Sequence, residues 1–274
     1  MISRRKRHAF LQSIFWNRIG RKIVPKIAKF EVMFDTVVRG YSLIPDSNGE
    51  EWLPTLAGEN TTMFDVGFYS GSSTTEYLTL YENAKVHAFD PSRFGLQNYE
   101  KDFAGDARVT FAPVALSSVP GELEFYDYEN MCNSLAQRKE MPGQEPTVYT
   151  VEVTTLDAYC AANDVDHIHH LKIDAEGYDL DVLEGARRML EEQKIDIFMF
   201  EFASGWAATK RYLWEAVEYM EPLPYTLCRL YNGFLVPVEY HINQDSCTTR
   251  PAMYVGVSNN RMARGDIETR DYNF

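Results

Sequence analysis

Short apolar runs alternate with segments of helical periodicity along the central part of the chain. Four runs have the length and composition of strands buried in a sheet, and they cover residues 61–66, 85–90, 167–174 and 195–201. Apolar residues recur at helical spacing in residues 93–103, 180–186 and 211–220. Strands that alternate with helices are typical of a parallel sheet with helices on both faces, so the pattern predicts an α/β fold.

The remaining apolar segments extend this sheet. We expect a third strand over residues 109–116, and a pair of added strands over 121–128 and 147–153. Residues 225–238 and 252–257 are predicted as two strands that close the sheet with an antiparallel edge.

The chain has no linker rich in Pro, Gly or Ser that would separate a second domain, and its length allows one sizeable core. We therefore expect an N-terminal extension over residues 1–50, one α/β domain over 51–258 and a polar tail over 259–274. A polar insertion, residues 129–146, lies between the added strands. Its polar side chains, among them Arg138, form either part of an acceptor wall or a solvated loop.

The first predicted strand leads into a D-x-G-x-x-x-G loop formed by Asp65, Gly67 and Gly71. The glycines allow the backbone to turn and approach a ligand closely, and residues 72–76 supply hydroxyls that can cap the following helix. A dinucleotide fold binds pyrophosphate through G-x-G-x-x-G, whose second glycine is missing here, which disfavours a nicotinamide-dependent dehydrogenase. An acid at position 65 instead suits an ammonium group, as in S-adenosylmethionine. The alternative is a plain strand–turn–helix junction.

The second predicted strand also ends in an acid, Asp90, which precedes Pro91. A βαβ unit returns an acid to a ribose diol about 20 residues after the glycine loop, and Asp90 follows Asp65 by 25 residues. Its carboxylate can accept from both ribose hydroxyls. The alternative is that Asp90 is a turn residue.

The strand over residues 167–174 is followed by the acids Asp174 and Glu176. Ligands of open α/β sheets bind beyond the carboxyl ends of the strands, so these acids are placed where chemistry occurs, and Glu201 is expected at the same rim. Lys172 shares a strand face with Asp174, and a lysine in a core strand needs a carboxylate partner. It therefore either pairs with Asp174 or Glu201, or acts on the substrate.

The order of these motifs resembles that of the FkbM-type methyltransferases. The match spans about residues 60–203, and its most family-specific part is Thr-Leu-Asp at 155–157 followed by Lys-Ile-Asp-Ala-Glu-Gly at 172–177. Ala-Phe-Asp-Pro, Val-Ala-Leu-Ser and Asn-Ser-Leu precede them, at 88–91, 114–117 and 133–135. The resemblance implies a Rossmann-like class I methyltransferase that uses S-adenosylmethionine, with a mostly parallel seven-stranded sheet and helices on both faces. The expected N-terminal extension, which lies outside the match, is predicted to be helical.

The resemblance also implies site residues and an acceptor class. Together with the motifs, it leads us to expect cofactor binding by Asp65, Gly67, Phe68, Gly71, Asp90, Ala115 and Asp174, and catalysis by Lys172, Asp174 and Glu176. The acceptor it implies is a hydroxyl of a sugar, glycan, or glycosylated or polyketide-type metabolite. The family loop often has Ala-Asn where this chain has Phe68 and Tyr69. We expect these rings to line the cofactor or reshape the acceptor mouth.

Methylation of a hydroxyl requires removal of its proton. A histidine or carboxylate can take the proton, or a divalent cation can lower the pKa of the alcohol. Asp174 and Glu176 are hard oxygen ligands, so Mg²⁺ bound at Asp174 is one hypothesis. His169 and His170 precede the strand end and are expected to be core or sheet-face residues. The alternatives in function are a non-catalytic S-adenosylmethionine-binding interaction module, and a methyltransferase with another small-molecule or protein acceptor.

Charge is distributed unevenly along the chain. The first thirty residues hold nine basic and no acidic residues, a charge of +9. Because the whole chain has a net charge of −13, the other residues carry a net charge of −22. Because phosphate binding requires basic surface, the acidic body disfavours a nucleic-acid substrate. Four scattered cysteines, without C-x-x-C spacing, indicate neither a zinc site nor a disulfide framework, which favours a reducing cytoplasm.

The basic residues of segment 1–29 alternate with an apolar stripe that includes Phe10, Ile14, Phe15 and Ile19. This pattern predicts a basic amphipathic helix that is too short and too charged to span a bilayer. It either lies on an anionic membrane, as a peripheral contact, or packs against the acidic body.

Overall fold

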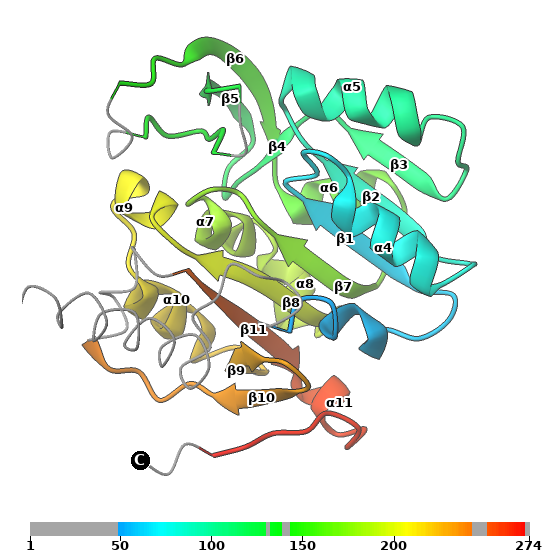
Figure 1. Ribbon diagram of the computed structural model, residues 1–274. Helices are drawn as coiled ribbons and strands as arrows, with labels where there is room; N and C mark the ends of the chain where they lie inside the picture. The colour runs from blue at the N-terminus through cyan, green and yellow to red at the C-terminus, as the bar shows by residue number, and fades with distance from the viewer. Residues whose placement is uncertain (1–48, 130–131, 139–142, 243–250, 272–274) are drawn as a thin grey trace, which may run out of the picture. The chain divides into compact units, whose positions relative to one another are not determined.

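The computed structural model describes residues 49–129, 132–138, 143–242 and 251–271 (Figure 1). The predicted α/β fold is confirmed in this part of the chain: its main sheet has the strand order β10-β9-β11-β8-β7-β1-β2-β3. The sheet has eight strands rather than the expected seven. Residues 1–48, which make up almost all of the expected N-terminal extension, lie outside the described residues.

The parallel part of the main sheet consists of β1 (Thr62–Val66), β2 (Lys85–Phe89), β3 (Val109–Ala112), β7 (Ile168–Ile173) and β8 (Ile195–Phe202). The antiparallel edge consists of β9 (Tyr225–Tyr231), β10 (Phe234–Pro237) and β11 (Ala252–Ser258). Nearly every residue of β7 and β8 is buried, and β8 has the near-continuous apolar sequence that such burial favours.

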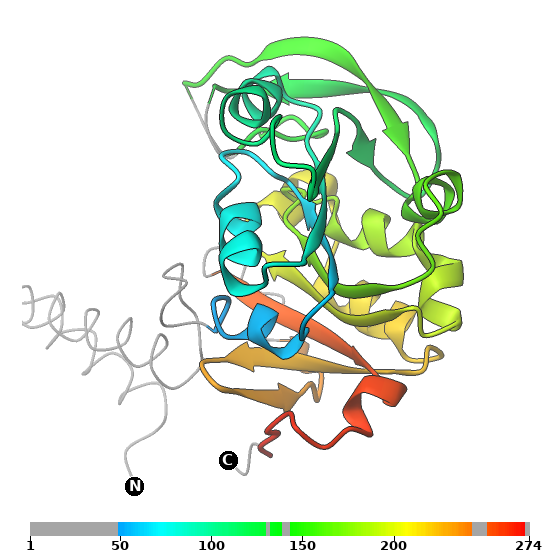
Figure 2. The ribbon, with the colours of Figure 1, turned by 90° about the vertical axis from the view of Figure 1, so that its right-hand side faces the viewer.

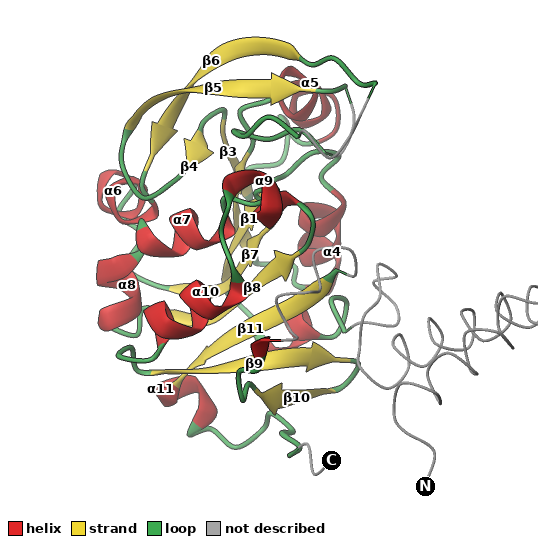
Figure 3. Cartoon of the chain, turned by 90° about the vertical axis from the view of Figure 1, so that its left-hand side faces the viewer, coloured by secondary structure: helices red, strands yellow, loops and turns green. Residues whose placement is uncertain are grey.

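Helices cover both faces of the sheet. Figure 3 shows α4 (Ser72–Leu80) on one side and α6 (Leu156–Ala162), α7 (Asp179–Glu184), α8 (Arg187–Glu191) and α10 (Leu213–Met220) on the other. The remaining helices are η1 (Leu53–Leu56), α5 (Arg93–Asp102), α9 (Gly205–Thr209) and α11 (Asn259–Met262). No helix within the described residues combines the length and apolar content needed to cross a membrane.

Two predicted strands are each divided in the structure. Residues 109–116 form β3 and the separate β4 (Ala115–Leu116), because Pro113 lacks the N–H group that a continuing strand would need. Residues 225–238 form the hairpin of β9 and β10, whose two-residue turn is Asn232-Gly233. This hairpin supplies the eighth strand of the sheet.

A second, three-stranded sheet has the order β4-β6-β5, with β5 at Gly121–Asp127 and β6 at Thr147–Thr154. The predicted pair of added strands is thus confirmed, and β5 and β6 pair antiparallel. Their inner face packs around Phe125, Val151 and Val153. Figures 1 and 2 show this sheet arching over one end of the main sheet.

The residues expected as a polar tail are packed against the domain as far as the structure describes them. Arg261 of α11 is buried, and its guanidinium contacts Asp266 and the carbonyl of Leu56. Further on, Leu235 of β10 donates its N–H to Glu268 and accepts from the N–H of Arg270. The C-terminal segment therefore covers the outer edge of β10, which would otherwise expose unpaired backbone groups.

Candidate active site

The register of the central strands brings the predicted acids to one edge of the sheet. Asp65 of β1 lies opposite Lys172 of β7, and Ile173 of β7 lies opposite Phe200 of β8. Residues that follow these positions, such as Asp174 and Glu201, therefore emerge side by side at the carboxyl ends of parallel strands. This is the edge at which the sequence placed the ligand site.

Lys172 is a buried cation held between two carboxylates. Its Nζ lies 3.4 Å from Asp174 Oδ2 and 3.6 Å from Asp65 Oδ1. Burial alone would lower the pKa of Lys172, but the charges of Asp174 and Asp65 raise it above its usual value. Lys172 is therefore charged at neutral pH and cannot accept a proton there. The sequence left open whether Lys172 pairs with a carboxylate or acts on the substrate, and the structure contains the pairing with Asp174.

Asp65 joins β1 to the start of α4. Its Oδ2 accepts hydrogen bonds from both the backbone N–H and the hydroxyl of Thr74, at 3.1 and 2.8 Å. The hydroxyls of residues 72–76, which were expected to cap the helix, thus lie inside α4. The carboxylate of Asp65 accepts an N–H group of the first turn of α4 instead. Burial raises the pKa of Asp65, although Lys172 opposes the shift. Its Oδ1 is buried without a hydrogen bond in the described structure.

The two loop glycines are required by internal packing. A Cβ on Gly67, whose φ is +82°, would lie 2.1 Å from the carbonyl oxygen of Asp174. A Cβ on Gly71, whose φ is +75°, would meet the rings of Phe68 and Phe103. Both positions therefore exclude a side chain before any ligand is considered.

The aromatic residues of the glycine loop have different positions. Phe68 is buried, and its ring packs edge-on against Phe103 and Phe111 in the core, so it does not line the rim. Tyr69 has a φ of 46°, and its ring lies 4.7 Å from that of Phe94, which is 41% exposed. Tyr69 is thus the aromatic side chain of this loop that borders solvent.

Asp90 lies beside the glycine loop, as predicted from the spacing. Its Oδ2 accepts from the N–H of Tyr69 at 2.6 Å and its Oδ1 from the N–H of Ser92 at 2.8 Å. Burial raises the pKa of Asp90, and these hydrogen bonds oppose the shift. Each oxygen retains a second lone pair, so the carboxylate can still accept from a ribose diol. Ala115, in contrast, lies in β4 and packs in the core of the smaller sheet.

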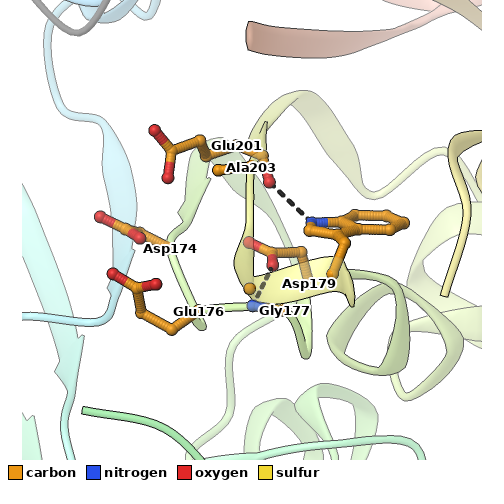
Figure 4. A pocket seen from close by; sticks show the side chains of 8 residues that line it. Asp174, Glu176, Gly177, Asp179, Glu201 and Ala203 are labelled. Atoms are coloured by element: carbon orange, nitrogen blue, oxygen red, sulfur yellow. Dashed lines mark hydrogen bonds between the residues drawn. The ribbon is translucent and has the colours of Figure 1, made fainter. Parts of the chain in front are cut away.

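A shallow indentation of about 150 Å³ marks the rim between β7 and β8 (Figure 4). Its lining includes the acids Asp174, Glu176, Asp179 and Glu201, together with Gly177, Ala203, Gly205 and Trp206. The expected position of Glu201 at the same rim as Asp174 is confirmed.

Crowding of these acids changes their protonation. Burial raises the pKa of Glu176 to about 7, that of Asp179 to about 8 and that of Glu201 to about 9, and the charge of Asp174 adds to each shift. Asp174 itself has 40% of its side chain exposed. The rim therefore contains carboxyl groups that exchange protons near neutral pH, as acid–base catalysis requires.

A family model described as the methyltransferase FkbM domain matches residues 65–229, which is more than half of the chain. The chain belongs to the FkbM methyltransferase family. It thus carries a methyltransferase domain, and the resemblance drawn from the motifs is confirmed. Among curated proteins no sequence matches this chain.

Solved structures similar to this FkbM chain are distant. A methyltransferase FkbM from Methylobacillus flagellatus is 16% identical with a TM-score of 0.45, and the match covers 72% of this chain and 44% of that one. An rRNA methylase from Streptococcus thermophilus is 14% identical with a TM-score of 0.41, covering 76% and 93%. A precorrin-6y C5,15-methyltransferase from Geobacter metallireducens is 13% identical with a TM-score of 0.39, covering 76% and 86%. This chain thus spans less than half the length of the first of these proteins.

The rim of this FkbM domain does not fit Mg²⁺. Within the described residues, no three His, Cys, Asp or Glu side chains are arranged to hold a metal ion. Asp174, the residue expected to bind the metal, has the ammonium group of Lys172 as its neighbour instead. A cation supplied by the protein thus already lies beside the carboxylate.

The histidines of β7 serve the sheet, as expected. His170 is buried against the ring of Tyr77, and burial lowers its pKa to about 3. His169 accepts a hydrogen bond at Nδ1 from the N–H of Thr62. Neither residue lines the indentation at the rim.

The ion pair of Arg138 with Glu176 was not predicted, although the sequence left open that the polar insertion forms part of an acceptor wall. Arg138 Nη1 contacts Glu176 Oε2 at 2.5 Å, and its Nη2 lies 3.0 Å from Ser204 Oγ. Arg138 belongs to the polar insertion, where the sequence has no periodicity that distinguishes an inward side chain from a solvated one. Only its charge could have indicated this contact in the sequence, because a basic residue in an acidic domain is surrounded by carboxylates.

Proposed function

We propose that the chain transfers the methyl group of S-adenosylmethionine to a hydroxyl of a sugar, a glycan or a glycosylated or polyketide-type metabolite. The single observation that carries this proposal is the position of Glu176 at the rim together with its raised pKa. Glu176 combines a position at the carboxyl end of the parallel sheet with a pKa of about 7, which suits a group that takes a proton at neutral pH.

The loop residues fit the proposed cofactor. Each carboxylate oxygen of Asp90 accepts one backbone N–H and keeps a second lone pair, so Asp90 would hold the ribose end. Asp65 Oδ1 lies 3.6 Å from the ammonium of Lys172, so Asp65 would shape the loop at the amino-acid end. When bound, S-adenosylmethionine supplies an electrophilic methyl group on a sulfonium. The protein must then position the acceptor oxygen and exclude water.

Glu176 is the proposed base. Its carboxylate takes the hydroxyl proton as the acceptor oxygen is methylated, and the proton then leaves to solvent. Asp174, which is more exposed, is proposed to accept a hydrogen bond from the acceptor and fix its orientation. Lys172 is proposed to hold Asp174 in place and to balance its charge rather than to act on substrate.

The acidic rim favours an acceptor that is rich in hydroxyl groups. Ionised carboxylates only accept hydrogen bonds, and a sugar offers several donors at short spacing. A phosphate-rich acceptor such as nucleic acid would instead be repelled by the charge of Asp174 and by Glu176 when it is ionised. The raised pKa values of the rim acids also disfavour a non-catalytic binding module, because such a module does not need acids that titrate near neutral pH.

The test is methyl transfer from labelled S-adenosylmethionine to a panel of free sugars, nucleotide sugars and lipid-linked glycans. Wild-type protein should label at least one sugar, and Glu176→Gln should reduce the rate by about 100-fold or more, as expected for loss of a general base. Glu192→Gln is the control, since Glu192 is half exposed and pairs with Arg188 on α8. Wild-type activity in Glu176→Gln would remove the proposed base.

A further inference from the structure

Arg138 connects three loops at the rim. It belongs to the segment 132–138, which we call the cover segment, and it contacts Glu176 in the loop after β7 and Ser204 in the loop after β8. Its own N–H donates to the hydroxyl of Tyr128, at the end of β5, at 2.7 Å. Only 3% of its side chain is exposed, so Arg138 is buried where it meets Glu176.

Glu176 is held from two directions by this segment. Arg138 binds its carboxylate at Oε2, and the hydroxyl of Ser134 donates to its backbone carbonyl at 3.0 Å. Ser134 is itself fixed by two backbone hydrogen bonds to Tyr126 of β5. Glu176 has a φ of 49°, in the left-handed region that a glutamate rarely adopts, so its conformation depends on such neighbours.

A buried ion pair of this kind is a weak source of stability. Removing an arginine and a carboxylate from water costs about as much as their attraction returns, and apolar replacements of similar volume are often neutral. The Arg138–Glu176 pair lies at the reactive rim and occupies one oxygen of the proposed base. Its position is better explained by orientation of Glu176, whose other oxygen, Oε1, is left to take the proton.

We propose that Arg138 is the positioning residue that orients Glu176 for methyl transfer and ties the cover segment to the acceptor site. This inference rests on the proposed function of Glu176 as the base. Arg138 acts through Glu176 and does not itself touch the reacting atoms. The cover segment then lies beside the acceptor, because Arg138 and Ser134 attach it to Glu176.

The experiment compares Arg138→Met, Arg138→Lys and Ser204→Ala with wild type, using the sugar acceptor found in the labelling panel. Arg138→Met should lower kcat by about 100-fold, the scale of a general-base contribution, while the Kd of S-adenosylhomocysteine changes less than about threefold. Arg138→Lys should recover at least about tenfold of that loss, because the ammonium can still pair with Glu176. Ser204→Ala should have a smaller effect, since Arg138 keeps its contact with Glu176.

Arg261→Met is the matched control, because Arg261 is equally buried and ion-paired but lies in α11. It should lower the melting temperature without lowering kcat. The double variant Arg138→Met/Glu176→Gln should be no slower than Glu176→Gln alone, since both changes remove the same group's action. Additive losses, or a kcat that falls no further in Arg138→Met than in Arg261→Met, would overturn the proposal.

Hydrogen exchange tests the same contacts without an acceptor. Backbone amides of residues 174–178 should exchange faster in Arg138→Met than in wild type, while those of α11 keep their wild-type rates. Should wild-type protein methylate no acceptor, the proposed function fails, and this measurement still decides whether Arg138 holds Glu176. Unchanged exchange at residues 174–178 would show that it does not.

Discussion

Replacing Lys172 with methionine tests whether the buried cation stabilises the site by pairing or acts on the substrate. Methionine is an unbranched side chain one atom shorter than lysine, and it removes the charge. Two carboxylates, Asp65 and Asp174, then lose their partner at the carboxyl ends of β1 and β7. We expect the folded state to lose free energy because Asp65 is almost fully buried.

The magnitude follows from the two distances. At an effective dielectric constant of about 20, unit charges 3.4 or 3.6 Å apart attract by about 5 kcal/mol. Half-exposed Asp174 is screened by solvent, so its pair with Lys172 contributes about 1 kcal/mol or less. Breaking the pair with buried Asp65 places the loss near the low end of the usual 3–5 kcal/mol range, or about 3 kcal/mol. At about 2–4 °C per kcal/mol, the melting temperature should fall by about 6–12 °C.

Urea denaturation and thermal melting measure this loss. Lys101→Met is the control, since Lys101 pairs with Asp102 at the surface with 75% of its side chain exposed, and it should change stability by less than about 1 kcal/mol. Asp65→Asn should restore part of the stability of Lys172→Met, because the unpaired charge is then absent. A Lys172→Met protein as stable as wild type, but without activity, would refute the pairing and assign Lys172 to the substrate.

Four further predictions concern the site and the N-terminus. Asp90→Ala should weaken binding of S-adenosylhomocysteine by about 1.5–3 kcal/mol in calorimetry, the range for hydrogen bonds to a charged group; unchanged affinity would remove Asp90 from the cofactor site. Because Glu176 must be ionised to act as base and has a pKa of about 7, kcat should rise with pH through about 7, and a flat profile from pH 5 to 8 would contradict this. Asp174→Asn should abolish turnover while the affinity for cofactor changes less than about tenfold. EDTA should leave wild-type activity unchanged, and a loss of activity in EDTA that Mg²⁺ restores would show a metal site. Residues 1–29 should cause sedimentation with anionic vesicles in low salt and release in high salt, so equal pelleting after their deletion would end the membrane hypothesis.

Much of the fold follows from the sequence because its strands are buried on both sides. The short strand segments β1, β2, β7 and β8 could be recognised in the sequence, and parallel pairing then brings the acids at or after their ends to a single edge. Asp65, Asp90 and Asp174 were placed at that edge by this reasoning alone. Family resemblance added the chemistry that the edge serves.

The missed features depend on local backbone rules that the apolar pattern conceals. Asn232-Gly233, between two apolar runs, is a strong hairpin signal and marks the turn between β9 and β10. Pro113 similarly ends β3 before the chain enters the second sheet. Both residues were visible in the sequence, but the length of the apolar segments outweighed them in the prediction.

Tertiary contacts account for what the sequence could not give. Gly67 faces the carbonyl of Asp174, more than a hundred residues away, so its expected role toward a ligand could not be separated from packing. Arg138 reaches Glu176 only because the second sheet folds over the rim. Phe68 points into the core since the turn at Gly67 directs it there, although the sequence allowed either direction.

The central claim is that Glu176 serves methyl transfer to a hydroxyl oxygen, and the chemical stability of the transferred label tests it most directly. Protein incubated with labelled S-adenosylmethionine and a sugar acceptor should yield a methyl ether, which retains its label in alkali, and Glu176→Gln should yield about 100-fold less of it in the same time. A product whose label is released by alkali, as from a methyl ester, or equal yields from both proteins, would contradict the account.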